Sequence, residues 1–442
     1  MIKLCLLVLV GLSQGMSAWG ARLQDSEFFD YDLRFTNPSC RTYYYPRGVT
    51  SNSGESLRAK PKNAFCSSSD ASRSAARKGS PEYKILEWIN SPETKEIFFT
   101  FLSFSNGRVA EALCQAAKRG VKITFSIDTP VGTPEEQERK VARAKELEQC
   151  RPRGGGPGPT FLTRGHEGGI LWSHNKLIII NPGSKAKYQL AYASANLSSG
   201  TVTHHENWHF VTTHASTYFA QVHKCLMNGM IDYGRSDSAY SRYIQNCRRA
   251  IAADEESDIK VFLVPGEGEQ AEEAIVDNLK AARSVDMATH RFSLSSLRRV
   301  LRDKLAQSGF SARLIADDDV YWEGTNGEDI SPNTPSEFRN LKRLERRGLD
   351  LKYMETNHWE RQLHHNKFII FDYAGDRQDK VFTGAGNFTG NAFSVNYENY
   401  YLISIPQVVD QFKKQYRYMW DRLATAEQDL PSENVEPGRG SR

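Results

Sequence analysis

The sequence predicts an α/β protein with two similar lobes, each an α/β/α sandwich around a mixed sheet, that share one active site. Three observations lead to this fold class. Residues 174–181 read HNKLIIIN and residues 365–372 read HNKFIIFD, so one motif occurs twice. Strand-like apolar runs alternate with helical patterns in both halves of the chain. The length of 442 residues leaves room for about two domains, each with its own core.

The first repeat is expected over residues 81–253. Pro81 suits the first position of a helix, and Gly120 suits the position just after a helix end. Runs rich in Ile, Phe and Val predict buried strands, and the Pro/Gly-rich residues 151–159 predict a loop. The elements expected in order are helix 81–90, strand 96–104, helix 107–119, strand 121–127, helix 134–149, a strand at the motif, strands 188–193 and 206–212, and helix 218–227.

The second repeat is expected over residues 259–425, after an acidic linker at 254–258. It restarts the same alternation of strands and helices, which predicts helices on both faces of a mixed sheet. The expected elements are strand 259–264, helix 269–282, strand 284–292, helix 295–307, strand 312–316, helix 335–347, strands 349–354, 365–371, 381–383 and 399–405, and helix 408–423.

The two ends of the chain differ in composition from the repeats. Residues 1–20 carry a single charge, Lys3, followed by a short apolar run and small residues before Gly20, which predicts a secretory signal peptide rather than a membrane anchor. Residues 21–80 are polar and loop-rich, and we expect an irregular N-terminal arm that packs on the main body. Residues 426–442 predict a disordered tail.

Cysteine use and charge suggest the compartment. Of seven cysteines, one lies in the signal segment and six follow it, an even number typical of disulfide-bonded exported proteins. Their spacing does not choose among the possible pairings, and free buried thiols are the alternative. The net charge is only +4 and lacks a clear basic stripe, which does not favour long nucleic acid as a partner. We expect a secreted or periplasmic monomer without a transmembrane helix.

Each copy of the motif places an imidazole beside an ammonium group. On a strand, His174 and Lys176 point the same way, as do His365 and Lys367. The pair suits a phosphate, because lysine can hold an oxygen while histidine attacks phosphorus or moves a proton. With two copies, one histidine can attack while the other protonates the leaving oxygen and then activates water. Two lysines supply the electrostatic support, so no metal and no cofactor are expected.

Four downstream residues also recur in register. Asn196 and Asn387 each lie 22 positions after a motif histidine, at the end of a small-residue turn that lets backbone approach a ligand. Both asparagines begin N-x-S/T sequons, but we interpret them as phosphate-binding groups. Glu206 and Glu398 follow the histidines by 32 and 33 positions and are expected to fix the histidine tautomers.

This doubled pattern resembles the phospholipase D superfamily, whose signature is a repeated HKD motif of His-x-Lys, four residues and Asp. The second copy matches in full at His365, Lys367 and Asp372, and the resemblance covers about residues 81–425. It implies two similar α/β domains around one site and a two-step, metal-independent phosphodiesterase reaction. In many members the first-copy histidine is the nucleophile, so we expect His174 to attack and His365 to act as general acid and base. The neighbouring His364 would face the opposite side of the strand.

The first copy departs from the signature, because Asn181 stands where Asp is expected. Tyrosyl-DNA phosphodiesterases of the same superfamily also lack that acid, so its loss does not imply an inactive half. A residue five positions past Lys176 lies about 16 Å further along an extended strand. We therefore expect Asn181 and Asp372 to be structural.

The resemblance identifies a superfamily but not a substrate. The leading hypothesis is a phosphoric diester hydrolase that removes phospholipid head groups at a membrane surface, the phospholipase D reaction. Export and modest charge favour it, and Trp172, Trp322 and Trp359 near the motifs could contact lipid. The alternatives are a secreted nuclease, in which these rings would stack on bases, and a non-catalytic module that binds phosphate or lipid.

Two further patterns raise the question of a metal. Residues 205–209 read HENWH, which matches the helical zinc-protease signature, but the surrounding residues favour a strand. On a strand, His205 and His209 would lie about 13 Å apart, too far to share one ion. Residues 317–319 are three aspartates at the end of an expected strand, and we interpret them as a polar loop.

Overall fold

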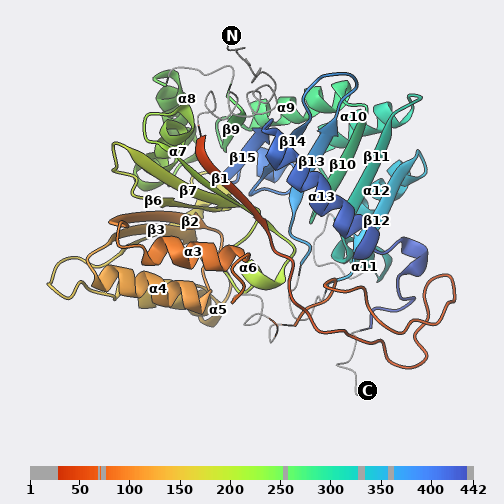
Figure 1. Cartoon of the computed structure of the whole chain (residues 1–442), viewed down its shortest axis with the longest axis horizontal. Helices are drawn as coiled ribbons and strands as arrows, with labels where there is room; N and C mark the ends of the chain where they lie inside the picture. The colour runs from red at the N-terminus through yellow and green to blue at the C-terminus, as the bar shows by residue number, and fades with distance from the viewer. Residues whose placement is uncertain are drawn as a thin grey trace, which may run out of the picture.

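Two mixed β-sheets, each covered by helices, stand side by side in the protein (Figure 1). This description rests on a computed structural model and covers residues 28–67, 70, 76–251, 257–326, 334–356 and 363–435. The first sheet has the order β1-β8-β7-β6-β2-β3-β4-β5 and the second β12-β11-β10-β13-β14-β15-β9. The predicted α/β class with two similar lobes is confirmed. The predicted signal peptide and the first residues of the acidic linker lie outside the described residues.

The first lobe contains the expected elements in their expected order and adds five that the sequence did not predict: β1, β4, β5, α6 and α8. Its strands are β1 (Phe28–Phe35), β2 (Glu96–Phe101), β3 (Lys122–Asp128), β4 (Thr160–Glu167), β5 (Ile170–Trp172), β6 (Leu177–Ile180), β7 (Lys187–Ala193) and β8 (Asn207–His214). Its helices are α3 (Pro81–Asn90), α4 (Gly107–Lys118), α5 (Pro134–Glu148), α6 (Gly200–Thr203), α7 (Tyr218–Asn228) and α8 (Asp237–Arg249), with a π-helical turn at Gly229–Tyr233.

The second lobe repeats this plan. Its strands are β9 (Ile259–Val264), β10 (Ser284–Thr289), β11 (Ser311–Asp317), β12 (Leu349–Met354), β13 (Lys367–Asp372), β14 (Lys380–Gly384) and β15 (Glu398–Ile403). Its helices are α9 (Gly268–Ala281), α10 (Ser295–Leu305), α11 (Asp318–Asn326), α12 (Thr334–Glu345) and α13 (Pro406–Arg422). Helix α11 begins directly after β11, so the three aspartates that we interpreted as a polar loop instead join a strand to a helix.

Local sequence explains where the helices begin. Thr133 caps α5 through a capping box with Glu136, and Pro134 takes the first turn. Asn106 caps α4 by accepting a hydrogen bond from the amide of Val109. Because these caps satisfy backbone donors that have no partner inside the helix, they fix where each chain turn ends and the helix starts.

The two motif strands are buried on both faces, which explains their continuous apolar runs. Along β6, Leu177 and Ile179 pack into a core that lies between the two sheets, and Ile178 and Ile180 pack under the outer helices α3–α5. The core between the sheets also takes side chains from α7 and α13 and joins both lobes. The two lobes therefore form one packed body, with the motif strands at its centre.

The strand order shows that the first repeat begins earlier than expected. Strand β1 pairs antiparallel with β8, as β9 pairs with β15, so β1 occupies in the first sheet the place of β9 in the second. It lies within residues 21–80, which we expected to form an irregular arm outside a repeat starting at residue 81. The sequence missed it because one strand, separated from its repeat by a long insertion, carries no periodic signal of its own.

The described residues between β1 and α3, here called the N-terminal insertion, and the segment that follows α13 pack together on the second lobe. Asn52 donates hydrogen bonds to the Tyr321 hydroxyl and to the carbonyl of Glu427. A short 3-10 helix follows at Glu427–Asp429, and Leu430 is fully buried. The segment up to residue 435 is thus ordered, against the prediction of a disordered tail from 426, and residues 436–442 lie outside the described part.

All six cysteines after the signal segment form disulfides, which join Cys40 to Cys66, Cys114 to Cys150 and Cys225 to Cys247. Each bridge closes a loop within one lobe or within the N-terminal insertion, and none links the lobes. Among the described residues, no helix is both long and apolar enough to cross a bilayer.

Candidate active site

The two motif histidines lie where the lobes meet. The amide of His174 donates to the carbonyl of Tyr397 in the second lobe, at 2.9 Å. The amide of His365 donates to the carbonyl of His205 in the first lobe, also at 2.9 Å. Both histidines precede their motif strand by a few residues rather than lying within it. The backbone at each motif histidine is therefore hydrogen-bonded to the backbone of the opposite repeat, in a nearly two-fold symmetric way.

Each histidine is held by the glutamate of the opposite repeat. His174 Nδ1 lies 2.8 Å from Glu398 Oε2, and His365 Nδ1 lies 3.0 Å from Glu206 Oε1. The structure thus places each of the two predicted glutamates against a motif histidine, with an exchange between lobes that sequence alone did not specify. Hydrogen bonding at Nδ1 leaves Nε2 of each ring available for chemistry.

Burial keeps both imidazoles neutral. The side chains of His174 and His365 are only 12% and 6% exposed. Burial lowers the pKa of each ring well below its usual value, and the nearby Lys176 and Lys367 lower it further. A neutral ring whose Nδ1–H is bonded to a glutamate carries a lone pair on Nε2, which is the form that can attack phosphorus or accept a proton.

The two motif lysines are buried beside the histidines. Each ammonium donates to the backbone carbonyl of its own motif histidine, at 2.9 Å in both copies. Burial lowers the pKa of Lys176 to about 8 and that of Lys367 well below its usual value, although Glu206 and Glu398 counteract the effect. A phosphate anion placed between the two ammonium groups would restore their charge, so the cluster suits an anionic ligand.

Asn196 and Asn387 lie at the predicted small-residue turns. Both are partly buried, and the amide oxygen of each is shielded from solvent without a hydrogen-bond partner in the described structure. A buried acceptor without a partner is costly unless a ligand donates to it, whereas the amide nitrogen of each side chain is the atom that can donate to a phosphate oxygen. The turn must be small: a Cβ on Gly386 would collide with the Tyr400 hydroxyl and approach the Glu398 carboxyl.

A second pair of asparagines connects the two motifs. Asn399 accepts a hydrogen bond from the backbone amide of Lys176 at 3.0 Å, and Asn207 donates to the side chain of Asn366 at 3.0 Å. Both asparagines directly follow the orienting glutamates and are fully buried. They fix the start of each motif strand from the opposite lobe.

The fifth position after each motif lysine lies at the far end of the motif strand and does not reach the site. Asn181 has a positive φ of 54° and accepts hydrogen bonds from the amides of Lys95 and Glu96. The Asp372 carboxylate forms ion pairs with Arg283 and Lys413. Asn181 therefore joins the end of its motif strand to the start of β2.

Sequence reasoning missed two buried aspartates that support the histidines. Asp128 accepts the backbone amide of Ser173 at 2.7 Å, and Asp317 accepts that of His364, in each case the residue before a motif histidine. Both aspartates end the corresponding parallel strand, β3 or β11. Matched positions in the two repeats could have revealed this pair. Burial raises the pKa of Asp128 to about 6.

In the part of the chain that the structure describes, two groups of side chains have ligand atoms within 4.8 Å of one another, close enough to hold a metal ion. The first group is His204, Glu206 and His365, and the second is His290, Asp317 and Asp319. The first group faces the ammonium groups of Lys367 and Lys176, which repel a cation. We therefore assign it no metal. The HENWH stretch is not helical, since residues 207–214 form β8, and His209 bonds Asn207 and Tyr31 instead of reaching an ion.

The predicted aromatic contacts fall into three cases. Trp172, which lies two residues before His174, is 37% exposed, and its ring packs edge-on against that of His166. Trp322 is largely buried, and its indole donates to Asp318, so it belongs to the core of the second lobe. Trp359 lies outside the described residues. In the N-terminal insertion, Tyr43 and Tyr45 are buried.

A comparison with protein-family models finds a match in the second lobe. Residues 275–420, most of the second repeat, match a family model described as cardiolipin synthase, PLD-like domain. The resemblance to the phospholipase D superfamily is confirmed. A comparison with curated proteins finds no match.

Among the solved structures that this chain resembles, one has a TM-score above 0.5. Phosphatidylserine synthase from Haemophilus influenzae matches 78% of this chain and 85% of its own, with a TM-score of 0.52 at 13% identity. Yeast tyrosyl-DNA phosphodiesterase matches 71% of this chain and 84% of its own, at 12% identity and a TM-score of 0.42. NucT from Helicobacter pylori matches 38% of this chain and 98% of its own, at 19% identity and a TM-score of 0.31. The first of these extends the phospholipase D-like fold over both lobes.

Proposed function

We propose that this protein is a metal-independent phosphodiesterase that works through a phosphohistidine intermediate. One observation carries the proposal: two neutral histidines, each held by the glutamate of the opposite lobe, lie beside two buried lysines. A buried pair of ammonium groups needs an anion, and the histidines provide a nucleophile and an acid–base partner.

The reaction follows in two steps. Nε2 of His174 attacks phosphorus, the bond to the leaving alcohol oxygen breaks, and His365, which takes up a proton at Nε2 when the anionic substrate binds, gives that proton to the leaving oxygen. Water then attacks phosphorus and gives a proton to His365, while the bond from phosphorus to His174 breaks and the phosphomonoester leaves. Lys176 and Lys367 hold the non-bridging oxygens in both steps, together with the amides of Asn196 and Asn387.

We propose phospholipid head groups as the substrate. The matching family model is described as a cardiolipin synthase domain, and a phosphatidylserine synthase shares the fold. Trp172, exposed beside His174, is placed to contact an acyl chain or a head group. Three disulfides support a secreted or periplasmic location, where we expect the protein to act as a monomer on a membrane surface.

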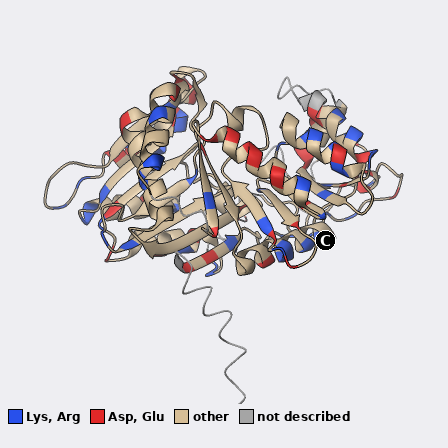
Figure 2. Cartoon of the chain, turned by 90° about the horizontal axis from the view of Figure 1, so that it is seen from above, with Lys and Arg blue, Asp and Glu red and all other residues tan. Residues whose placement is uncertain are grey.

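A groove on the second lobe favours a nuclease as the second candidate. It has a volume of about 590 Å³ and lies between α10 and α12. Over the chain as a whole, basic and acidic residues are interspersed (Figure 2). Six arginines line it, without an acidic residue: Arg298, Arg299, Arg302, Arg343, Arg346 and Arg347. In a concave lining such as this, the arginines can follow a phosphate backbone.

Turnover on both substrates in parallel tests the proposal. Protein lacking residues 1–20 is assayed in EDTA on phosphatidylcholine vesicles and on single- and double-stranded DNA. Choline release supports the phospholipase, and DNA cleavage that falls steeply with salt supports the nuclease. The variants His174→Asn and His365→Asn should each lose at least about a hundredfold in rate while keeping their melting temperature.

A matched control separates chemistry from folding. His214→Asn makes the same replacement at the far end of β8 and should leave turnover unchanged. Near-normal activity of either motif variant on every substrate would refute the two-histidine mechanism. Loss of activity in EDTA with recovery in zinc would refute metal independence. Ligand binding without turnover in the unmutated protein would identify the non-catalytic binding module.

A further inference from the structure

The two halves of the site differ at one position. Two residues before each orienting glutamate, the first repeat has His204 and the second has Asn396. Asn396 donates a hydrogen bond to Glu398 at 3.1 Å. His204 Nδ1 lies 3.4 Å from Glu206 Oε1. An otherwise symmetric site thus gives one glutamate an amide that cannot titrate and the other an imidazole that can.

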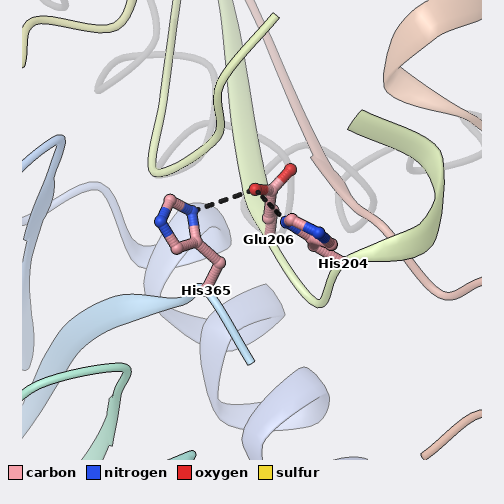
Figure 3. Close-up of side chains that lie close together, drawn as sticks. All are labelled: His204, Glu206 and His365. Atoms are coloured by element: carbon pink, nitrogen blue, oxygen red, sulfur yellow. Dashed lines mark hydrogen bonds and ion pairs between the residues drawn. The ribbon is translucent and has the colours of Figure 1, made fainter. Parts of the chain in front are cut away.

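His204 and His365 approach the same carboxylate oxygen from two sides (Figure 3). Their ring centroids are 5.9 Å apart, and the side chain of His204 is 13% exposed, about twice as much as that of His365. The local chain makes room for this ring, because a Cβ on Gly200 would lie 2.4 Å from His204 Nδ1. The result is a chain of imidazole, carboxylate and imidazole that leads from the reacting ring towards solvent.

The other groups around His365 do not repeat this arrangement. His290 lies on another side, with ring centroids 5.5 Å apart, and its nearest acid, Asp319, is 3.8 Å away. Lys367 and Lys176 face both motif histidines and so do not distinguish them. Among the groups hydrogen-bonded or ion-paired to the two glutamates, His204 and Asn396 are therefore the pair that separates the two histidines.

We propose that His204 is a positioning residue that assigns acid–base work to His365 and leaves His174 as the nucleophile. This inference rests on the proposed function. Through Glu206, His204 holds the Nδ1 side of the His365 ring and can exchange a proton with solvent when His365 gains one from water. On the opposite side, Asn396 fixes Glu398 and the tautomer of His174 without taking part in proton exchange.

The different roles of the two histidines are seen in the proton transfer of the second step. Water loses a proton to Nε2 of His365, its oxygen bonds to phosphorus, and the bond from phosphorus to Nε2 of His174 breaks. Burial lowers the pKa of His365, Lys367, His290 and Lys176 lower it further, and His204 adds to their effect. Because His365 must be neutral to accept the proton, removing His204 should move the rise of this step to higher pH.

Bis(4-nitrophenyl) phosphate separates the two steps. Its leaving group departs without an acid, so the first step appears as a burst of nitrophenol and the second as the steady rate that follows. His204→Gln keeps an amide that can bond Glu206 but cannot exchange protons. We expect an unchanged burst and an unchanged kcat/KM, a steady rate at least about tenfold lower, and a steady-rate profile shifted to higher pH. Asn396→Ala should slow the burst instead.

The outcomes separate this inference from the proposed function. A steady-rate profile of His204→Gln that superimposes on that of the unmutated protein overturns the role of His204. So does a steady rate that is lost in EDTA and restored by zinc, because the three groups would then hold an ion. If the unmutated protein shows no burst and His365→Asn traps no phosphohistidine, the proposed function itself fails. A phosphohistidine trapped at His174 in His365→Asn supports both.

Discussion

The departure of the first motif from the family signature gives a sharp prediction, because Asn181 has a structural role with measurable parts. Its side chain accepts the amides of Lys95 and Glu96 and donates to the carbonyl of Glu93, at 2.7, 3.1 and 3.0 Å. Its φ of 54° lies in the left-handed region, which asparagine tolerates better than most residues.

Replacing Asn181 with alanine removes all three hydrogen bonds. It also places at a positive φ a residue whose methyl group cannot form the local hydrogen bonds by which asparagine tolerates that conformation. Partly exposed hydrogen bonds of this kind contribute about 1–2 kcal/mol together, and the backbone conformation adds about 1 kcal/mol. The total of about 2–3 kcal/mol corresponds to a melting temperature lower by about 5–10 °C for a lobe of this size. Asn181→Gly loses the hydrogen bonds, but glycine adopts a positive φ without strain. Its melting temperature should therefore lie between those of the alanine variant and the unmutated protein.

Asn181→Asp tests whether the missing acid matters to chemistry. It keeps the two acceptor bonds, loses the donor to Glu93 and adds a charge beside Glu96, so we expect a small loss of stability and unchanged turnover. Thermal unfolding and nitrophenyl phosphate turnover measure the two effects. A tenfold gain in turnover on restoring the acid, or an alanine variant as stable as the unmutated protein, would refute a purely structural role.

Two further predictions concern stability. Burial raises the pKa of Asp128 to about 6, above an unfolded value of about 3.9, so its ionisation should remove up to about 3 kcal/mol of stability as pH rises from about 4 to about 6. Asp128→Asn should therefore melt higher than the unmutated protein at pH 8 and lose this advantage near pH 4, and a difference that does not vary with pH would contradict the assignment. The double variant Cys114→Ala/Cys150→Ala opens a loop with a sequence separation of 36 and should cost about 2–4 kcal/mol in thermal unfolding, whereas equal melting temperatures with and without reductant would argue against this bridge.

Much of the fold could be predicted because its signals are local. Alternating apolar runs and capping residues placed most strands and helices within a few residues of their positions, including the helices at Pro81 and Pro134. Strand β1 was missed, since its place beside β8 depends on pairing across a long insertion. The order of the C-terminal segment was missed for a similar reason: Leu430 is buried by the second lobe and not by its own neighbours.

The sequence by itself determined the chemical inventory of this protein: two histidines, two lysines, two asparagines and two glutamates in matching register. Only the tertiary structure decided how they combine. His174 bonds Glu398 across a separation of 224 residues, and His365 bonds Glu206 across 159. A repeat pattern fixes what each half contains, but an exchange of partners between halves depends on how the lobes pack. The same packing brings His204 to His365, because only the folded interface places residues so distant in the chain on one carboxylate.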